Sequence, residues 1–298
     1  MKLPTWLEYL LGLRQRPRYV TSPGTANQPG RVRCVELRDG DSLWQGEKNY
    51  LRRLGERYYE FFDPRQDRTK PAPVVMLLHG RGGNAANARH TFQFEAEAEK
   101  RGWVVVYPAG QRLGVPVEFN LGWNDGVGQA DPPKDDVMFL HHVLYDIESI
   151  LPVGPLCVGG HSNGSAMAFR YGMRSDQVKC IAGNAGAIAP EAWSLRIPVF
   201  YSHSTDDPLV TYEDCVLMVI DWAKHNGANL ERSKRSKTGN CIKYEYDHDQ
   251  HPVARWSINP GAHSVPGGKA GPHEPFAEPI NQDVSWAKEV AEFFERVM

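Results

Sequence analysis

Short apolar runs alternate with longer amphipathic stretches along most of this chain. The apolar runs, which are typical of strands buried on both faces, are residues 73–78, 103–107, 156–158, 180–182 and 198–201. The stretches with helical spacing of apolar residues are 85–100, 136–150, 163–173 and 212–226, the second of them capped by Asp136. This alternation predicts an α/β fold in which a mostly parallel central sheet carries helices on both faces.

Further segments extend the pattern toward both ends of the chain. Residues 57–62, 243–246 and 254–258 have the composition of extended segments. A last helix is expected from Asp283, since its apolar residues fall on one stripe. We therefore expect one domain over residues 51–298, preceded by a partly irregular extension over residues 1–50.

The N-terminal region has little of this regularity. Residues 1–11 are largely apolar but contain Glu8, and no small-residue cleavage site follows them, so they predict a short amphipathic helix and not a signal peptide. Residues 19–32, rich in Pro, Gly, Thr and Asn, are expected to form an arm or linker. The expected location is the cytoplasm, and secretion stays open if residues precede Met1.

The net charge and the lengths of the apolar stretches argue against nucleic acid and membranes as partners. The chain has 34 Lys and Arg against 36 Asp and Glu, a net charge of −2, so nothing indicates a nucleic-acid surface. The basic cluster 231–237 is predicted to be a solvated turn. No apolar stretch approaches the ~20 residues that span a bilayer, so we expect no membrane partner.

Cysteine spacing argues against a metal site. The five cysteines are widely spaced, without a Cys-x-x-Cys pair or a zinc motif: Cys34, Cys157, Cys180, Cys215 and Cys241. Cys157 and Cys180 lie in apolar runs and are expected to be core residues. The odd count leaves at least one thiol free in a monomer, which favours a reducing compartment, although one or two disulfides stay open.

A glycine-flanked serine follows one of the predicted strands. Residues 160–164, Gly-His-Ser-Asn-Gly, fit the pattern Gly-x-Ser-x-Gly between the run 156–158 and a predicted helix. A turn this tight needs small flanking residues, and it exposes the serine hydroxyl above the sheet. Ser162 is therefore the predicted nucleophile.

A serine nucleophile needs a base and an acid that orients the base. Where the nucleophile follows a strand in this way, the chain order is serine, then aspartate or glutamate, then histidine. Residues 203–210 follow the run 198–201, so Asp206 and Asp207 compete for the role of acid. Pro208 disfavours a helical conformation at Asp207, which does not decide between them.

Several downstream histidines compete for the role of base. His263 is the best placed, because it lies in a loop of Gly and Pro after a predicted strand, and His273 is the main alternative. His225 falls in a predicted surface helix, and His248 and His251 fall in a charged stretch that predicts an exposed turn.

Acyl transfer also needs two N–H donors for the oxyanion. One is expected from Asn163, the residue after the nucleophile, and the other from the loop 79–84 after the run 73–78. Arg81 is the predicted second donor, through its backbone N–H, with Gly82 as the alternative and as a substrate-binding residue. His79 precedes the nucleophile and is expected to be structural.

Six motifs in order resemble the polyhydroxybutyrate depolymerase and feruloyl esterase group of α/β-hydrolases, over about residues 55–295. They are His79 to Gly83, Trp123-Asn124-Asp125, Asp135 to Leu140, Ser162-Asn163-Gly164, His203 to Pro208 and Gly261 to Gly267. The resemblance implies the α/β-hydrolase fold, and it places Asp207, not Asp206, on the family's catalytic aspartate. It also implies that Trp123 borders the substrate cleft, although a core position is an equal alternative. Asp135 and Asp136 are expected to cap a helix.

The chain departs from the family pattern at three positions. Val265 replaces a tryptophan beside the histidine, Ser165 replaces a glycine after the serine turn, and Ala228 replaces a cysteine found in many relatives. The substrate classes that the resemblance implies are hydroxyalkanoate polyesters or oligomers and feruloyl or acetyl esters. The departures leave the shape of the acyl pocket open.

The expected activity is hydrolysis of carboxylic esters by Ser162, His263 and Asp207, without a cofactor or metal. Because imidazole must be neutral to act as a base, activity is expected to fall below roughly pH 6.5. Two alternatives stay open: a serine peptidase of the same fold, and an inactive hydrolase scaffold used for binding. The expected partner is a small or oligomeric ester, and the sequence does not predict the oligomeric state.

Overall fold

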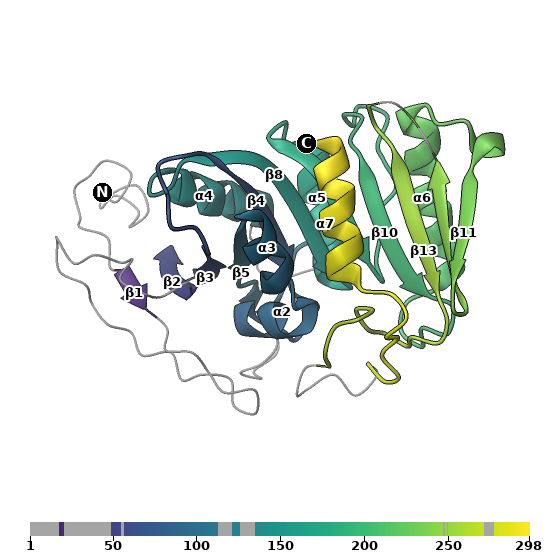
Figure 1. Ribbon diagram of the computed structural model, residues 1–298, viewed down its shortest axis with the longest axis horizontal. Helices are drawn as coiled ribbons and strands as arrows, with labels where there is room; N and C mark the ends of the chain where they lie inside the picture. The colour runs from purple at the N-terminus through teal and green to yellow at the C-terminus, as the bar shows by residue number, and fades with distance from the viewer. Residues whose placement is uncertain are drawn as a thin grey trace.

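One mixed sheet organises the molecule (Figure 1). The computed structural model describes residues 18–20, 49–54, 57–112, 121–125, 135–246, 248, 250–270 and 277–298. Within them, eleven strands are ordered β1-β2-β3-β5-β4-β8-β9-β10-β13-β12-β11. The neighbours that pair in parallel are β5 (Val104–Pro108), β4 (Ala72–Leu78), β8 (Val153–His161), β9 (Val178–Asn184), β10 (Val199–Ser204) and β13 (Val253–Ile258). The predicted mostly parallel central sheet is confirmed.

Antiparallel strands extend this parallel centre at both ends of the sheet (Figure 1). Beside β5 lie β3 (Arg57–Phe62), β2 (Asn49–Leu54) and β1 (Arg18–Val20). Beside β13 lie β12 (Cys241–Tyr246) and β11 (Lys234–Thr238). Two short strands, β6 (Gln111–Arg112) and β7 (Leu121–Gly122), pair separately, and a 3-10 turn covers Leu230–Arg232.

The basic cluster 231–237 forms most of an edge strand, so the predicted turn is wrong there. Every side chain of β11 is exposed, which agrees with the predicted solvation. The pair Thr238 and Cys241 closes the ladder around Gly239 and Asn240, and Gly239 has φ 55°. A two-residue Gly-Asn turn is a hairpin signal, and Lys and Arg on an edge strand oppose association with other strands.

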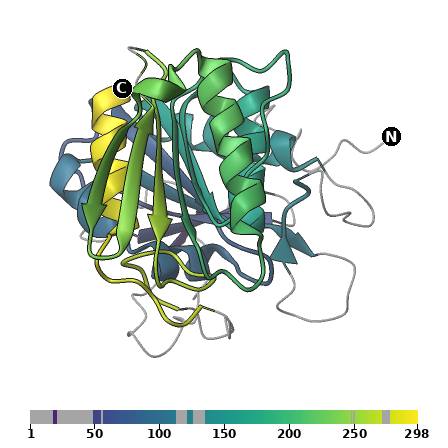
Figure 2. The same ribbon diagram turned by 90° about the vertical axis from the view of Figure 1, so that its right-hand side faces the viewer.

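Helices cover both faces of the sheet (Figure 2). One face carries α4 (Asp136–Glu148), α5 (Asn163–Arg174) and α6 (Tyr212–Asn226), whose buried residues share one apolar core. The other face carries α2 (Ala85–Phe92), α3 (Glu95–Arg101) and α7 (Trp286–Val297), which share a second core. The layered arrangement follows from the apolar stripe that each helix directs to the sheet.

Two local predictions are corrected. The expected helix 85–100 is interrupted at Gln93, whose backbone is left-handed (φ 51°) and whose side chain donates to His90 O at 2.6 Å. The cap of α4 is Asp135, which accepts the Met138 N–H, and Asp136 is the first helical residue. Asp136 is buried, and its carboxylate accepts hydrogen bonds from the Arg57 guanidinium, the Gln111 side chain and the Asn124 N–H. These donors compensate the buried charge of Asp136 better than a helix terminus alone would.

Other predictions concern residues outside the described part. The helix predicted for residues 1–11 and most of the arm 19–32 lie there. The four described cysteines are buried and unpaired, so Cys157 and Cys180 are core residues as predicted. In the described ranges, no helix combines the length and apolarity needed to cross a bilayer, and no cluster of metal-binding side chains occurs.

Candidate active site

The predicted nucleophile lies on a strained turn between β8 and α5. Ser162 has φ 55° and ψ −125°, a conformation that side-chain-bearing residues adopt at a cost of ~1–3 kcal/mol and that concentrates at functional sites. The flanking glycines are sterically required. A Cβ on Gly160 would lie 2.2 Å from Gly164 O, and one on Gly164 would lie 2.3 Å from His79 O. The Ser162 N–H donates to Asn184 O at 2.8 Å, which ties the turn to β9.

Asp207 and His263 lie together at the carboxyl ends of two adjacent strands. Asp207 follows β10 and His263 follows β13, and these strands pair in parallel. The His263 Nδ1 hydrogen-bonds to Asp207 Oδ2 at 2.8 Å, while the Asp207 side chain is fully buried. Burial opposes ionisation of Asp207, yet the hydrogen bonds from His203 and His263 hold its pKa well below the ordinary value. The buried carboxyl is therefore ionised at neutral pH.

The adjacent Asp206 has a different set of contacts. Its Oδ1 accepts the Gly261 N–H at 3.0 Å and the Ala262 N–H at 3.3 Å. These contacts fix the loop that carries His263. Of the two competing aspartates, Asp207 contacts the histidine and Asp206 contacts the backbone before it.

His161, the residue before the predicted nucleophile, packs against His263. The rings of His161 and His263 lie 4.6 Å apart, centroid to centroid. Burial, reinforced by His263, lowers the pKa of His161 to about 3, so His161 is neutral, and its Nδ1 hydrogen-bonds to Asn184 Oδ1 at 2.6 Å. No hydrogen bond joins Ser162 Oγ to His263 in the described residues, and such bonds often form only when substrate is bound.

The loop after β4 packs directly on the serine turn. A Cβ on Gly80 would lie 3.4 Å from Ser162 Cβ. The Gly82 N–H donates to Leu121 O at 2.7 Å and the Gly83 N–H to Gly80 O at 3.1 Å, so both are occupied. The backbone N–H groups of Arg81 and Asn163 have no acceptor among the described residues. Of the two predicted donors in this loop, Arg81 is the one whose N–H has no acceptor in the part of the chain that the structure describes.

Trp123 supports the site from behind. Its N–H donates to Asn163 Oδ1 at 2.7 Å, its C=O accepts from Asn163 Nδ2 at 3.0 Å, and its indole N–H donates to His79 O at 2.8 Å. The side chain is completely buried. The expectation that Trp123 borders the cleft is therefore wrong, because its side chain has no exposed surface. Trp123 is a core residue, the alternative prediction, and it holds Asn163 and the loop after β4 in place.

His79 is structural, as predicted. Its Nε2 accepts the Gly110 N–H at 2.8 Å, and its Nδ1 lies 2.7 Å from Gly80 O, which assigns the proton to Nδ1. Burial lowers the pKa of His79 to about 4, in agreement with a neutral ring. Both bonds fix the course of the loop that carries Arg81.

The other candidate bases lie apart from Asp207. His225 contacts Ser194 O at 2.9 Å, and the rings of His248 and His251 stack on each other. His273 lies outside the described residues. Within the described chain, the second histidine on Asp207 is His203, whose Nε2 lies 3.0 Å from Oδ2. No role was predicted for His203 from the sequence, although its place four residues before Asp207, just after a predicted strand, was a usable signal.

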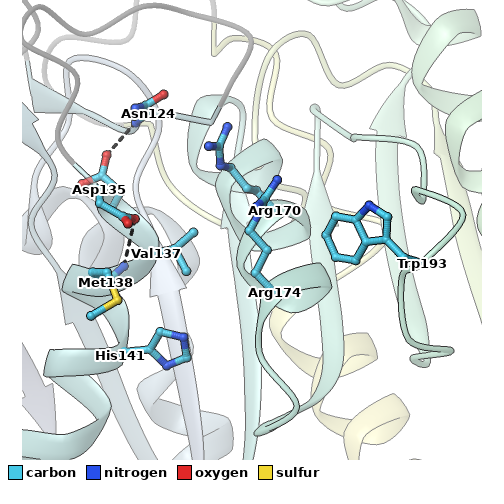
Figure 3. A pocket seen from close by; sticks show the side chains of 9 residues that line it. Asn124, Asp135, Val137, Met138, His141, Arg170, Arg174 and Trp193 are labelled. Atoms are coloured by element: carbon cyan, nitrogen blue, oxygen red, sulfur yellow. Dashed lines mark hydrogen bonds between the residues drawn. The ribbon is translucent and has the colours of Figure 1, made fainter.

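A separate hollow of about 630 Å³ lies between α4, α5 and the segment around Trp193 (Figure 3). It is lined by Asn124, Asp135, Asp136, Val137, Met138, His141, Arg170, Arg174 and Trp193. None of Ser162, Asp207 and His263 lines it. Its connection to the serine turn is indirect, through Asn124, whose neighbours Trp123 and Asp125 both hydrogen-bond to Asn163.

Comparisons with known proteins identify the fold. No protein-family model matches the chain, and no curated protein matches its sequence. Among solved structures, it resembles an acetyl xylan esterase from Aspergillus awamori at a TM-score of 0.55 and 13% identity, over 70% of this chain and 90% of the other. It resembles a cold-adapted esterase from an Arctic intertidal metagenomic library at 0.53 and 13%, over 89% and 100%.

A third structure widens the range of neighbouring activities. A dienelactone hydrolase-like promiscuous phosphotriesterase from metagenomic libraries matches at a TM-score of 0.53 and 14% identity, over 81% of this chain and 92% of the other. At this identity the likeness concerns the fold. The strand order, the strained serine turn after β8 and these structural matches together show that the chain has the α/β-hydrolase fold.

Proposed function

We propose that the protein is a serine hydrolase of carboxylic esters. The observation that carries the proposal is the Asp207–His263 hydrogen bond of 2.8 Å beside the strained turn of Ser162. A buried carboxylate on Nδ1 fixes the tautomer that leaves Nε2 free to accept a proton, and it stabilises the imidazolium that forms. The fold and the esterases that share it support the same class.

In the proposed reaction, Ser162 Oγ attacks the ester carbonyl while His263 Nε2 takes the hydroxyl proton. The tetrahedral intermediate collapses as His263 passes that proton to the leaving alcohol, which leaves an acyl group on Ser162. Water, deprotonated by the same imidazole, then attacks the acyl carbonyl. The second intermediate collapses as His263 returns the proton to Ser162 Oγ, which releases the acid. No cofactor or metal takes part in these steps.

The oxyanion of each intermediate is assigned to the backbone N–H groups of Arg81 and Asn163. Both are free of protein acceptors in the described residues, whereas the Gly82 N–H is occupied by Leu121 O. A donor that is unused before the reaction is available to the developing charge without breaking another bond. Gly82 is retained as a substrate-binding residue because it adjoins Arg81 and lacks a side chain that would narrow the cleft.

For the substrate we propose an acetyl or feruloyl ester or a hydroxyalkanoate oligomer. The motif resemblance supports this range, and an acetyl xylan esterase is among the structural neighbours. A panel of p-nitrophenyl esters of increasing acyl length, together with methyl ferulate and a hydroxybutyrate oligomer, separates these classes.

The direct test measures hydrolysis of p-nitrophenyl acetate and butyrate by the wild type and by Ser162→Ala. We expect turnover to fall to the background rate in the variant, since no other group of the site replaces the serine oxygen. Full turnover in a folded Ser162→Ala protein would remove the proposal. A serine peptidase would use the same residues, so peptide p-nitroanilides belong to the panel. An inactive scaffold would fail to react with a fluorophosphonate.

A further inference from the structure

The carboxylate of Asp207 has four hydrogen-bond donors. Oδ1 accepts the N–H of Leu209 at 2.8 Å and of Val210 at 3.0 Å. Oδ2 accepts from His263 Nδ1 at 2.8 Å and from His203 Nε2 at 3.0 Å. A carboxylate offers about four lone-pair sites, so this group is saturated. Its orientation is set from three sides, and only one of the four partners is the proposed base.

His203 is buried in a continuous chain of polar groups. Its side chain has no exposed surface. Because an ionised carboxylate only accepts, Nε2 carries the proton that faces Asp207. On the other side of the ring, Nδ1 lies 2.9 Å from Tyr201 Oη, and that oxygen accepts the Gly186 N–H at 3.1 Å.

The far end of this chain reaches the serine turn. A Cβ on Gly186 would lie 2.5 Å from Ser162 O, so the two backbones are in contact. Gly186 O accepts the hydroxyl of Ser165, and Ser165 Oγ accepts the Asn184 N–H at 3.0 Å. The polar chain therefore joins Ser165, in the first turn of α5, to Asp207 by a path separate from His263.

We propose that His203 is a positioning residue of the triad, which acts through Asp207 by holding Oδ2 toward His263. The inference rests on the proposed function and adds a residue to it. Without the Nε2–H donor, Oδ2 keeps a single partner, and the carboxylate turns about its Cβ–Cγ bond at lower cost. His263 then loses the fixed ring orientation that proton transfer requires, and small misplacements of this kind cost up to ~100-fold in rate.

The surroundings of His203 keep this donor in place over a wide pH range. Burial alone would lower the pKa of His203, but its bond to Asp207 and the neighbouring Cys215 raise it above the ordinary value. Tyr201 and Cys215 are both buried, and Tyr212 from α6 faces the ring edge-on. Whether the ring is neutral or charged, Nε2 keeps its proton, so the positioning role does not depend on the charge of His203.

The test compares His203→Leu, which removes the donor, with His203→Gln, which returns an amide N–H close to the position of Nε2. We expect kcat for p-nitrophenyl butyrate to fall 30- to 100-fold in His203→Leu with KM within about twofold, because the residue does not reach the cleft. His203→Gln should recover kcat to within about fivefold of the wild type. The matched control is His225→Gln. His225 is a half-buried histidine whose Nε2 lies 2.9 Å from Ser194 O and which has no contact with Asp207 among the described residues, so kcat should stay unchanged.

A second readout does not require turnover. The proton NMR signal of the His263 Nδ1–H, at low field when bonded to a carboxylate, should persist in His203→Gln and broaden or disappear in His203→Leu. Wild-type kcat and an intact signal in a folded His203→Leu protein would overturn the inference. If His203→Leu does not fold, His203→Asn replaces it, because its shorter amide does not reach Oδ2. Wild-type kcat and an intact signal in His203→Asn would then reject the inference. Absence of all esterase activity in the wild type would reject the proposed function instead, while the NMR comparison still tests His203.

Discussion

Two polar regions of the molecule differ in how their charged groups are held. At the carboxyl ends of β10 and β13, the proposed acid and base are held by partners: His263 bonds to Asp207, and Asp207 accepts from four donors. In the hollow between α4 and α5, Asp135 and Asp136 are held by hydrogen bonds, but the buried Nε of Arg170 has no hydrogen-bond partner among the described residues, and Trp193 is 53% exposed (Figure 3). Groups that are already fixed stabilise developing charge without reorganising during the reaction. The difference supports the proposal that catalysis takes place at the strand ends and not in the hollow.

The largest expected effect on activity comes from replacing Asp207, and the same replacement at Asp206 serves as its control. Asp207→Asn keeps the shape of the side chain but removes the charge and favours the wrong tautomer of His263, so kcat should fall ~10³- to 10⁴-fold. Asp206→Asn, which keeps an acceptor for the N–H groups of Gly261 and Ala262, should lose no more than about tenfold. Rates with p-nitrophenyl butyrate measure both. A larger loss in Asp206→Asn would exchange the two roles.

A second prediction concerns the tight packing of the serine turn. In Gly164→Ala the new Cβ would lie 2.3 Å from His79 O, so the loop after β4 or the turn must move. We expect kcat to fall about 100-fold and the free energy of unfolding to fall by ~1–3 kcal/mol. The control is Gly80→Ala, whose nearest neighbours lie at 3.4 Å and which should cost far less on both measures. Equal effects would show that the turn is not sterically tight.

The buried neutral histidines of the site predict a pH-dependent stability. The pKa of His79 is lowered to about 4 and that of His161 to about 3. As the pH falls from 6.5 toward 4, the unfolded chain binds protons on both residues and the folded chain does not. The free energy of unfolding therefore decreases over this window, by up to ~1.4 kcal/mol per pH unit for each residue.

Urea unfolding between pH 7.5 and 4.5 measures this decrease, and His161→Gln should reduce its slope. Comparison of the two proteins is needed because His203, with its raised pKa, gains stability as the pH falls and partly offsets the change. Asp207, whose pKa is lowered, loses its contribution only below its ordinary value of 3.8, outside the window. Identical slopes in the two proteins would contradict a buried neutral His161.

The smallest expected effect is in the hollow. Arg170→Gln should leave kcat and KM for p-nitrophenyl acetate within twofold of the wild type, because none of the proposed catalytic side chains lines this region. A loss of tenfold or more would mean that the hollow takes part in the reaction and that the contrast between the two regions is wrong.

Much of the fold was predictable because its signals are local. Apolar runs marked β4, β5, β8, β9 and β10, and the helix α6 began and ended where its apolar spacing indicated. The edge strand β11 was missed because all its side chains are exposed, so no apolar pattern marks it. The interruption of the predicted helix 85–100 at Gln93 was missed because no Gly or Pro, the usual helix-ending residues, occurs there.

The candidate site was predictable only where the type of a residue and its order along the chain were enough to indicate its role. Ser162, Asp207 and His263 follow strands in the order that the fold requires. The separate contacts of Asp206 and Asp207 depend on where the loop after β13 lies in space. The burial of Trp123 and the bond from His203 to Asp207 depend equally on contacts between distant segments, which a single sequence does not contain.

The most direct test of the central claim is covalent labelling of the nucleophile. The wild-type protein is treated with a fluorophosphonate, digested and examined by mass spectrometry. We expect one adduct, on Ser162, formed rapidly in the wild type, far more slowly in Asp207→Asn, and not at all in Ser162→Ala. An adduct on another residue, or undiminished labelling of Ser162→Ala, would contradict the central claim.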